Sequence, residues 1–224
     1  MEIRHEKLVG QHGLEQLNKA HVTVFGIGGV GGYAAEALAR SFVGGITLID
    51  CDDVDKSNIN RQIAALTSTI GQAKVEVMKK RILDINPECN AVAVKVFIKA
   101  DNAEELISGS TYVVDAVDNV TAKLAIITAC QSKSIPCISA MGAGNKLKGD
   151  FEVTDIFKTS GDALARVMRR ELKKRGISSQ KVVCTTEKAL CELEKGEPMP
   201  SISYMPGLCG LTLAGEVIRD IIET

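Results

Sequence analysis

The stretch VTVFGIGGVGGYAAEALARSFVGGITLID at residues 22–50 decides the fold of this chain. It predicts a strand at 22–25, a glycine turn at 26–32, a helix at 33–40 and a second strand at 46–50. Both strands are nearly continuous apolar runs, which is typical of parallel strands that are covered on both faces. We therefore expect a complete β-α-β unit.

The same alternation of strand and helix continues beyond this unit. It predicts helices at 71–86 and 124–130 and strands at 91–97, 112–118 and 135–139. Repeated β-α-β order favours an α/β fold with a Rossmann-like, doubly wound and mostly parallel sheet.

The C-terminal third has a different pattern. Residues 151–155 alternate like a strand but follow no helix, so they predict antiparallel C-terminal edge strands. A basic helix at 162–175, a loop at 191–206 and a final helix at 210–222 complete the chain. We expect a single domain at 1–224, with a nucleotide-binding core at about 20–145 and an elaboration at about 146–224.

Composition excludes several classes of protein. The formal net charge of −1 gives no general attraction to nucleic acid or membranes, so any such surface must be local. The seven cysteines are odd in number and never spaced as C-x-x-C, which disfavours a disulfide framework or a zinc knuckle. No apolar run is long enough for a membrane helix or resembles a signal peptide, so we expect a soluble, cytoplasmic protein.

The glycine turn predicts a nucleotide site. Gly26, Gly28, Gly29 and Gly31 follow a strand and open a helix, so their backbone N–H groups can bind phosphate oxygens. Asp50 ends the next strand, where a carboxylate can bind ribose hydroxyls. The alternative is a glycine turn that binds no nucleotide. An NAD-dependent dehydrogenase fits the same pattern, so these residues do not identify the nucleotide.

Charged residues near the same sheet edge favour chemistry on a triphosphate. Arg61 and Lys74 belong to segments that leave this edge or return to it. Attack of a carboxylate on a triphosphate brings two anions together and needs cations, whereas hydride transfer has little use for them. Asp118, at the end of another strand, is a candidate magnesium ligand. Taken singly, the two cations could be solvated surface and Asp118 could cap a helix.

With these motifs, the chain resembles the superfamily of ubiquitin-activating-like adenylyltransferases. The shared pattern includes Ser57-Asn-Ile-Asn-Arg61-Gln62, Gly71-Gln-Ala-Lys74 and Asp115-Ala-Val-Asp118-Asn119. The resemblance implies that ATP is bound by the glycine loop with Asp50, Asp52 and Asn58. It implies that Arg61 and Lys74 stabilise the transition state and that Asp118 takes Mg²⁺. It also implies a homodimer, in which Arg4 reaches the partner subunit's ATP.

Within the superfamily, the chain is most similar to the family of tRNA threonylcarbamoyladenosine dehydratases. The likeness is carried by phrases such as Arg4-His-Glu-Lys-Leu-Val-Gly10, Met141-Gly-Ala-Gly-Asn-Lys-Leu147 and Gly207-Leu-Cys-Gly-Leu-Thr-Leu-Ala-Gly215. It implies that ATP adenylates the threonylcarbamoyl carboxylate of tRNA, which then cyclises with release of AMP. The alternative is an adenylyltransferase for sulfur-carrier proteins, which the missing C-x-x-C pairs disfavour. A monovalent cation and a partner cysteine desulfurase or other sulfur-acceptor system stay open.

A basic helix supports an RNA substrate. One face of the predicted helix at 162–175 carries five cations at spacings of three and four: Arg166, Arg169, Arg170, Lys173 and Lys174. Like charges so placed disfavour the helix unless a polyanion binds, so the face favours tRNA. An ordinary solvated face is the alternative. Cys184 and Cys191 are weaker candidates, as sulfur acceptors.

Overall fold

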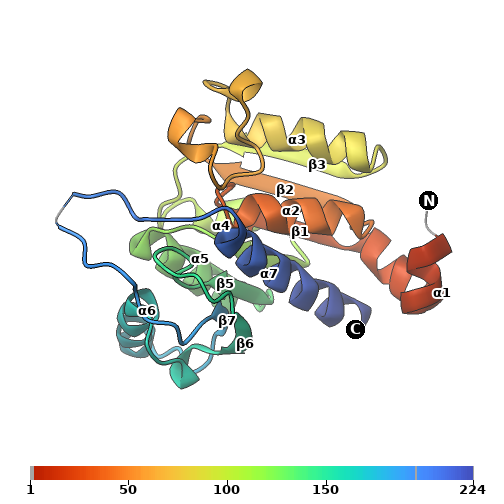
Figure 1. Ribbon diagram of the computed structural model, residues 1–224. Coiled ribbons are helices and arrows are strands. Elements are labelled where there is room, and N and C mark those ends of the chain that lie inside the picture. The colour runs from red at the N-terminus through yellow and green to blue at the C-terminus, as the bar shows by residue number, and fades with distance from the viewer. Residues whose placement is uncertain (1–2, 195, 224) are drawn as a thin grey trace.

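The computed structural model describes residues 3–194 and 196–223, and these residues contain one seven-stranded sheet (Figure 1). Its strand order is β3-β2-β1-β4-β5-β7-β6. Neighbouring strands are parallel except β6 and β7, which are antiparallel at the edge. The strands are β1 (His21–Phe25), β2 (Gly45–Asp50), β3 (Asn90–Lys95), β4 (Tyr112–Asp115), β5 (Cys137–Ala140), β6 (Glu152–Asp155) and β7 (Lys181–Cys184). The predicted mostly parallel sheet with an antiparallel edge is confirmed.

Helices cover both faces of the sheet, as doubly wound connectivity requires. One face carries α2 (Gly31–Arg40), α3 (Lys74–Ile85) and the long α7 (Tyr204–Ile222), with α1 (Ile3–Lys19) against α7. The other face carries α4 (Ala103–Leu106), α5 (Val120–Lys133) and α6 (Ala163–Lys174). Three short 3-10 helices, η1 (Lys56–Asn58), η2 (Thr67–Thr69) and η3 (Ile156–Lys158), lie in connections between described elements.

The strands supply apolar side chains to a core on each face. Val24, Leu48 and Val114 are fully buried under α2, α3 and α7, while Phe25 and Val113 pack against α4 and α5 on the opposite face. Full burial of one such side chain stabilises the fold by about 1.5–3 kcal/mol. This two-sided burial explains why the strands are continuous apolar runs rather than alternating ones.

The final helix begins earlier than predicted. We predict a loop up to residue 206 and a helix from 210, but α7 starts at Tyr204. Pro206 lies in its first turn, where the missing N–H costs nothing. A Cβ on Gly210 would lie 2.2 Å from the carbonyl oxygen of Val30, so this glycine lets α7 approach α2 closely.

The sequence patterns do not predict three elements: α1, α4 and β7. Helix α1 is interrupted at Gly10, where φ is +73°, and this break hides its periodicity. Strand β7 has only four residues and lies between two polar segments. Among the described residues, no helix combines the length and apolar character needed to cross a membrane.

Candidate nucleotide and acceptor site

The glycine loop between β1 and α2 is shaped by steric limits. Gly26 has a φ of +83°, and a Cβ there would lie 2.7 Å from the carbonyl oxygen of Ala116. A Cβ on Gly31 would lie 1.9 Å from the carbonyl oxygen of Gly26. Gly28 differs, because the nearest atom to its missing Cβ is Gln62 Nε2 at 3.9 Å. The first two glycines allow the turn to form, while Gly28 leaves its backbone accessible to a ligand.

Asp50 ties the glycine loop to the end of β2. Its Oδ2 accepts the Ile27 N–H at 2.6 Å and its Oδ1 accepts the Asp52 N–H at 2.8 Å. The residue is only 8% exposed. Each carboxylate oxygen keeps a second lone pair, so Asp50 can still accept hydrogen bonds from ribose hydroxyls.

Lys74 is a buried cation at this edge of the sheet. It is the first residue of α3 and is 5% exposed, and its Nζ lies 2.8 Å from Asp52 Oδ2. The Lys74 ammonium, which donates to Asp52, holds the pKa of that carboxyl below its usual range. Because the Asp52 N–H binds Asp50, which in turn accepts the Ile27 N–H, Lys74 is connected to the glycine loop by three successive hydrogen bonds.

The backbone of Arg61 lies beside the glycine loop. Its carbonyl oxygen is 3.4 Å from the position of a Cβ on Gly29. Its Nη1 donates to the Ser57 carbonyl oxygen and to Asn60 Oδ1, both at 2.8 Å. Asn58 is buried and its Oδ1 accepts the Asp55 N–H at 3.0 Å, which fixes the start of this segment. The segment at 57–62 is therefore held against the loop.

Asp118 follows β4 and is exposed, with no hydrogen bond or ion pair among the residues that the structure describes. The cap of α5 is Asn119, whose Oδ1 accepts the Ala122 N–H at 3.0 Å, so the alternative role of Asp118 as a cap is wrong. Arg4 is exposed on α1, which lies beyond the start of β1, whereas the glycine loop follows its end (Figure 1). Within one chain, Arg4 does not join the site.

Two buried polar features at the site were missed in the sequence. Gln62 is 8% exposed, and its Oε1 has no hydrogen-bond partner among the described residues. Lys123 Nζ lies 3.0 Å from Asp115 Oδ2, and both side chains are fully buried directly behind the turn that carries Asp118. A lysine directly before the apolar helix predicted at 124–130 was the available signal for the second feature.

Helix α6 presents fewer free cations than its sequence suggests. Arg169 donates to the carbonyl oxygen of Thr159 at 2.8 Å and also to its hydroxyl. Glu171 accepts from Arg170 at 3.0 Å and Lys174 at 2.9 Å, and these contacts lower its pKa to about 2. Within the described chain, Arg166 and Lys173 are exposed and have no such partner. The apolar side of the helix is buried as expected.

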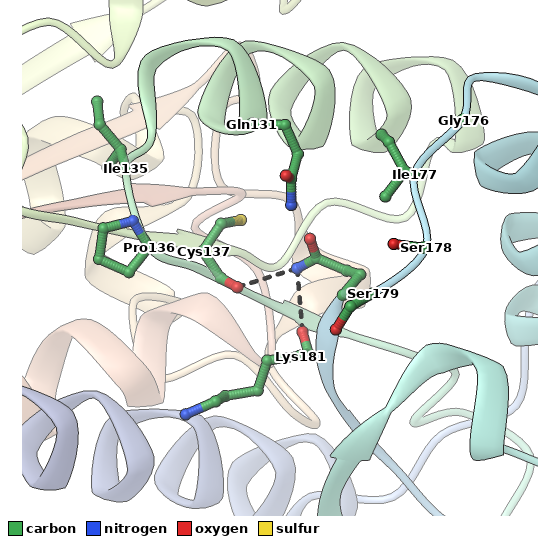
Figure 2. A pocket seen from close by; sticks show the side chains of 10 residues that line it. Gln131, Ile135, Pro136, Cys137, Gly176, Ile177, Ser178, Ser179 and Lys181 are labelled. Atoms are coloured by element: carbon green, nitrogen blue, oxygen red, sulfur yellow. Dashed lines mark hydrogen bonds between the residues drawn. The ribbon is translucent and has the colours of Figure 1, made fainter.

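A separate pocket and the two candidate cysteines lie outside the group of residues described above. Cys184 is buried, and burial raises the pKa of its thiol to about 11, while Cys191 is exposed. A pocket of about 440 Å³ is lined by Gln131, Pro136, Cys137 and the segment at 176–181 (Figure 2). It opens where β5 and β7 begin, whereas the glycine loop follows the end of a strand parallel to them. It is not part of the nucleotide site.

The fold and the site define a class of protein with a doubly wound sheet and a nucleotide loop at its first β-α turn. The ThiF family model matches residues 3–224, and the chain belongs to this family. It is 42% identical over 238 residues to the tRNA threonylcarbamoyladenosine dehydratase of Bacillus subtilis, covering 98% of this chain and 94% of that relative. It is 47% identical over 169 residues to the Escherichia coli dehydratase, covering 75% and 63%.

A solved structure has the same fold. The E. coli dehydratase in complex with ATP superimposes with a TM-score of 0.90 at 37% identity, covering 97% of this chain and 92% of that one. The same enzyme has been solved in complex with AMP, with a TM-score of 0.91. The family and these relatives make the chain an ATP-dependent enzyme.

Proposed function

We propose that the protein is an ATP-dependent tRNA threonylcarbamoyladenosine dehydratase. It adenylates the threonylcarbamoyl carboxylate of tRNA and cyclises the adenylate, releasing pyrophosphate and then AMP. The observation that carries this proposal is the buried Lys74 ammonium, joined through Asp52 and Asp50 to the glycine loop. Relatives that cover most of this chain carry the dehydratase name.

The charges at the loop suit this reaction. A carboxylate that attacks the α-phosphate of ATP is repelled by the phosphate oxygens, so the transition state gains from cations placed beforehand. Lys74 is already desolvated, and a buried cation interacts more strongly with phosphate than a solvated one does. Arg61 binds Ser57 and Asn60 through Nη1 alone, so its Nε and Nη2 can donate to the phosphates while these two bonds stay in place.

The nucleotide and its metal have suitable residues. The backbone at Gly28 and Gly29 would receive phosphates, Asp50 would bind ribose, and Asn58 would support the Arg61 segment. Asp118 offers an exposed carboxylate, the ligand type that Mg²⁺ prefers. Magnesium, when bound there, would neutralise part of the triphosphate charge.

RNA binding and dimerisation are further parts of the proposal. Arg166 and Lys173, together with Arg169, Arg170 and Lys174, would contact tRNA phosphates. On α7 the side chains of Tyr204, Leu208 and Leu211 are exposed at helical spacing and form an apolar stripe that a second copy would cover. In such a homodimer, Arg4 would complete the partner's site. We propose that residues 1–224 form one domain, because strands from both halves of the chain share one sheet. We also propose that the protein is cytoplasmic.

The test is the reaction itself. With ATP, Mg²⁺ and tRNA that carries threonylcarbamoyladenosine, we expect AMP and pyrophosphate to form only in the presence of that tRNA. The modified nucleoside should lose one water, as seen by mass spectrometry. Lys74→Met and Arg61→Ala should each lower kcat by about 100- to 1,000-fold, because each removes charge from the transition state.

Lys80→Met is the matched control, because Lys80 is exposed on the same helix α3 and should not affect turnover. Circular dichroism would check that every variant is folded. Turnover of a sulfur-carrier peptide without RNA, at a rate equal to that with tRNA, would instead favour the sulfur-carrier adenylyltransferase. Full activity in Lys74→Met would contradict the proposed chemistry.

A further inference from the structure

The side chain of Asn60 joins two segments that are far apart in the sequence. Its Oδ1 accepts from Arg61 Nη1 at 2.8 Å, and its Nδ2 donates to the carbonyl oxygen of Ser201 at 3.1 Å. The orientation of the amide is determined by chemistry, because a guanidinium can only donate and a carbonyl can only accept. Both ends of this one amide are therefore in use.

Ser201 ends a projecting segment, which we call the strap and define as 190–194 and 196–201 (Figure 1). Asn145 holds the base of the strap. Its Oδ1 accepts the N–H groups of Leu190 at 3.2 Å and Cys191 at 2.9 Å, and its own N–H donates to the Pro200 carbonyl at 2.7 Å. One buried residue thus binds the strap where it leaves the body and where it returns.

The strap and the residues that follow it contact both the glycine turn after β5 and the nucleotide loop. On one side, a Cβ on Gly144 would be 2.6 Å from Met199 Cγ, so the strap contacts the glycine turn that follows β5. On the other side, the chain runs on from Ser201 to Pro206, whose Cβ lies 3.0 Å from the Cβ position of Gly29. The exit of the strap therefore passes from the turn after β5 to the nucleotide loop.

We propose that Asn60 is a positioning residue that sets the orientation of Arg61 and the position of the strap together. The inference rests on the proposed function. Without the amide oxygen, Arg61 Nη1 keeps only the Ser57 carbonyl, and its guanidinium gains rotational freedom. Without the amide nitrogen, the strap loses the hydrogen bond that joins its exit to the Arg61 segment. Asn60 thereby joins the nucleotide loop and the strap, which contacts the glycine turn after β5, into one unit.

The two halves of the amide can be tested separately. In Asn60→Ala, kcat for tRNA-dependent AMP release should fall by about 10- to 100-fold, and the KM for tRNA should rise. The Kd for ATP, measured without tRNA, should change less than about threefold. Asn60→Gln, which keeps the amide on a longer stem, should retain more of kcat than Asn60→Ala does.

Asn145→Gly isolates the strap. Glycine tolerates the φ of +58° at this position, so the substitution removes the side-chain hydrogen bonds without straining the backbone. We expect the KM for tRNA to rise about tenfold with little change in kcat. In the double variant with Asn60→Ala, the rise in KM should be smaller than the product of the single effects, because both substitutions release the same strap.

The outcomes distinguish this role from the function on which it depends. Asn90→Ala is the control, an exposed asparagine at the start of β3, and should behave like the unaltered protein. Wild-type kcat and KM in Asn60→Ala would overturn the positioning role alone. A large fall in its Tm would do the same, because it would show a merely structural residue. An unaltered protein that released no AMP with tRNA would overturn the proposed function and this role with it.

Discussion

The buried pair of Lys123 and Asp115 supports the site from behind. Both side chains are fully buried with 3.0 Å between Nζ and Oδ2, so each charge depends on the other for solvation. Asp115 ends β4, and its Oδ1 accepts the Val117 N–H at 3.3 Å, inside the turn that carries Asp118. The pair therefore fixes a turn of the nucleotide site as well as part of the core.

Lys123→Met should destabilise the protein strongly. It leaves the Asp115 carboxylate buried without a partner, which typically costs about 3–5 kcal/mol. Thermal and urea unfolding should show a clear fall in Tm and in the midpoint. The double variant Asp115→Asn with Lys123→Met should be more stable than Lys123→Met alone, because it buries no unpaired charge. Equal stability of Lys123→Met and the unaltered protein would contradict this view.

Single residues were predictable where a motif and a sheet edge coincide. Asp50, Arg61 and Lys74 could be assigned to one edge, because parallel strands end at the same side of a sheet. The partners of Asn60 could not be assigned, since Ser201 is 141 positions away and only tertiary structure brings it near. The orphan Oε1 of Gln62 also needs coordinates, because burial of one atom has no signal in a single sequence.

At the scale of elements, strong periodicity was predictive and proline was misleading. Helix α6 begins and ends within a residue of its expected bounds, because Asp162 caps it and its apolar side is regular. Helix α7 is longer than predicted, because the three prolines of residues 191–206 indicate a loop, whereas the last of them, Pro206, lies in the first turn of the helix. Its glycines permit close contact with Tyr33 and Val30 of the α2 region. The same residue type thus marks a turn at Gly26 and a helix contact at Gly210.

The charge of α6 can be altered at Glu171, which binds three neighbouring cations: Arg170, Lys174 and Arg175. Its folded pKa of about 2 is depressed, so these ion pairs are complete above the usual glutamate pKa and disappear as the pH falls through about 2. At every pH at which tRNA binding can be measured, Glu171 is therefore charged. Its neutralisation requires a substitution.

Glu171→Gln should tighten tRNA binding, because it frees those cations for phosphates. Arg166→Ala with Lys173→Ala should weaken it and lower the slope of log affinity against log salt by about 2, one for each phosphate that is no longer neutralised. Fluorescence anisotropy across a salt series measures both effects. Glu88→Gln is a control, as it removes one exposed acidic charge in the turn between α3 and β3. Equal salt slopes for all variants would show that α6 does not contact the RNA.

At the scale of the whole molecule, the position of the site follows from the topology. Strand order changes direction between β1 and β4, because β2 and β3 lie to one side of β1 and the later strands to the other. Ligands of doubly wound sheets bind at such a switch point, beyond the carboxyl ends of the strands. The glycine loop follows β1 and Asp118 follows β4, so they flank that point. This much was predictable from the order of elements alone.

Arg4 lies beyond the opposite end of the sheet, so its proposed role can only be played in a neighbouring subunit (Figure 1). Mixing two inactive variants tests this. If Arg4→Ala and Lys74→Met subunits reassort at equal amounts, half of the dimers are mixed, and each has one site with an intact Lys74 and the partner's intact Arg4. Activity should recover to about one quarter of the unaltered value. AMP release before and after reassortment measures the recovery. Arg4→Ala mixed with Arg61→Ala should recover in the same way. Lys74→Met mixed with Arg61→Ala should stay inactive, because every site then carries one of the two substitutions. No recovery in the first mixture would place the action of Arg4 within its own chain or remove it from the reaction.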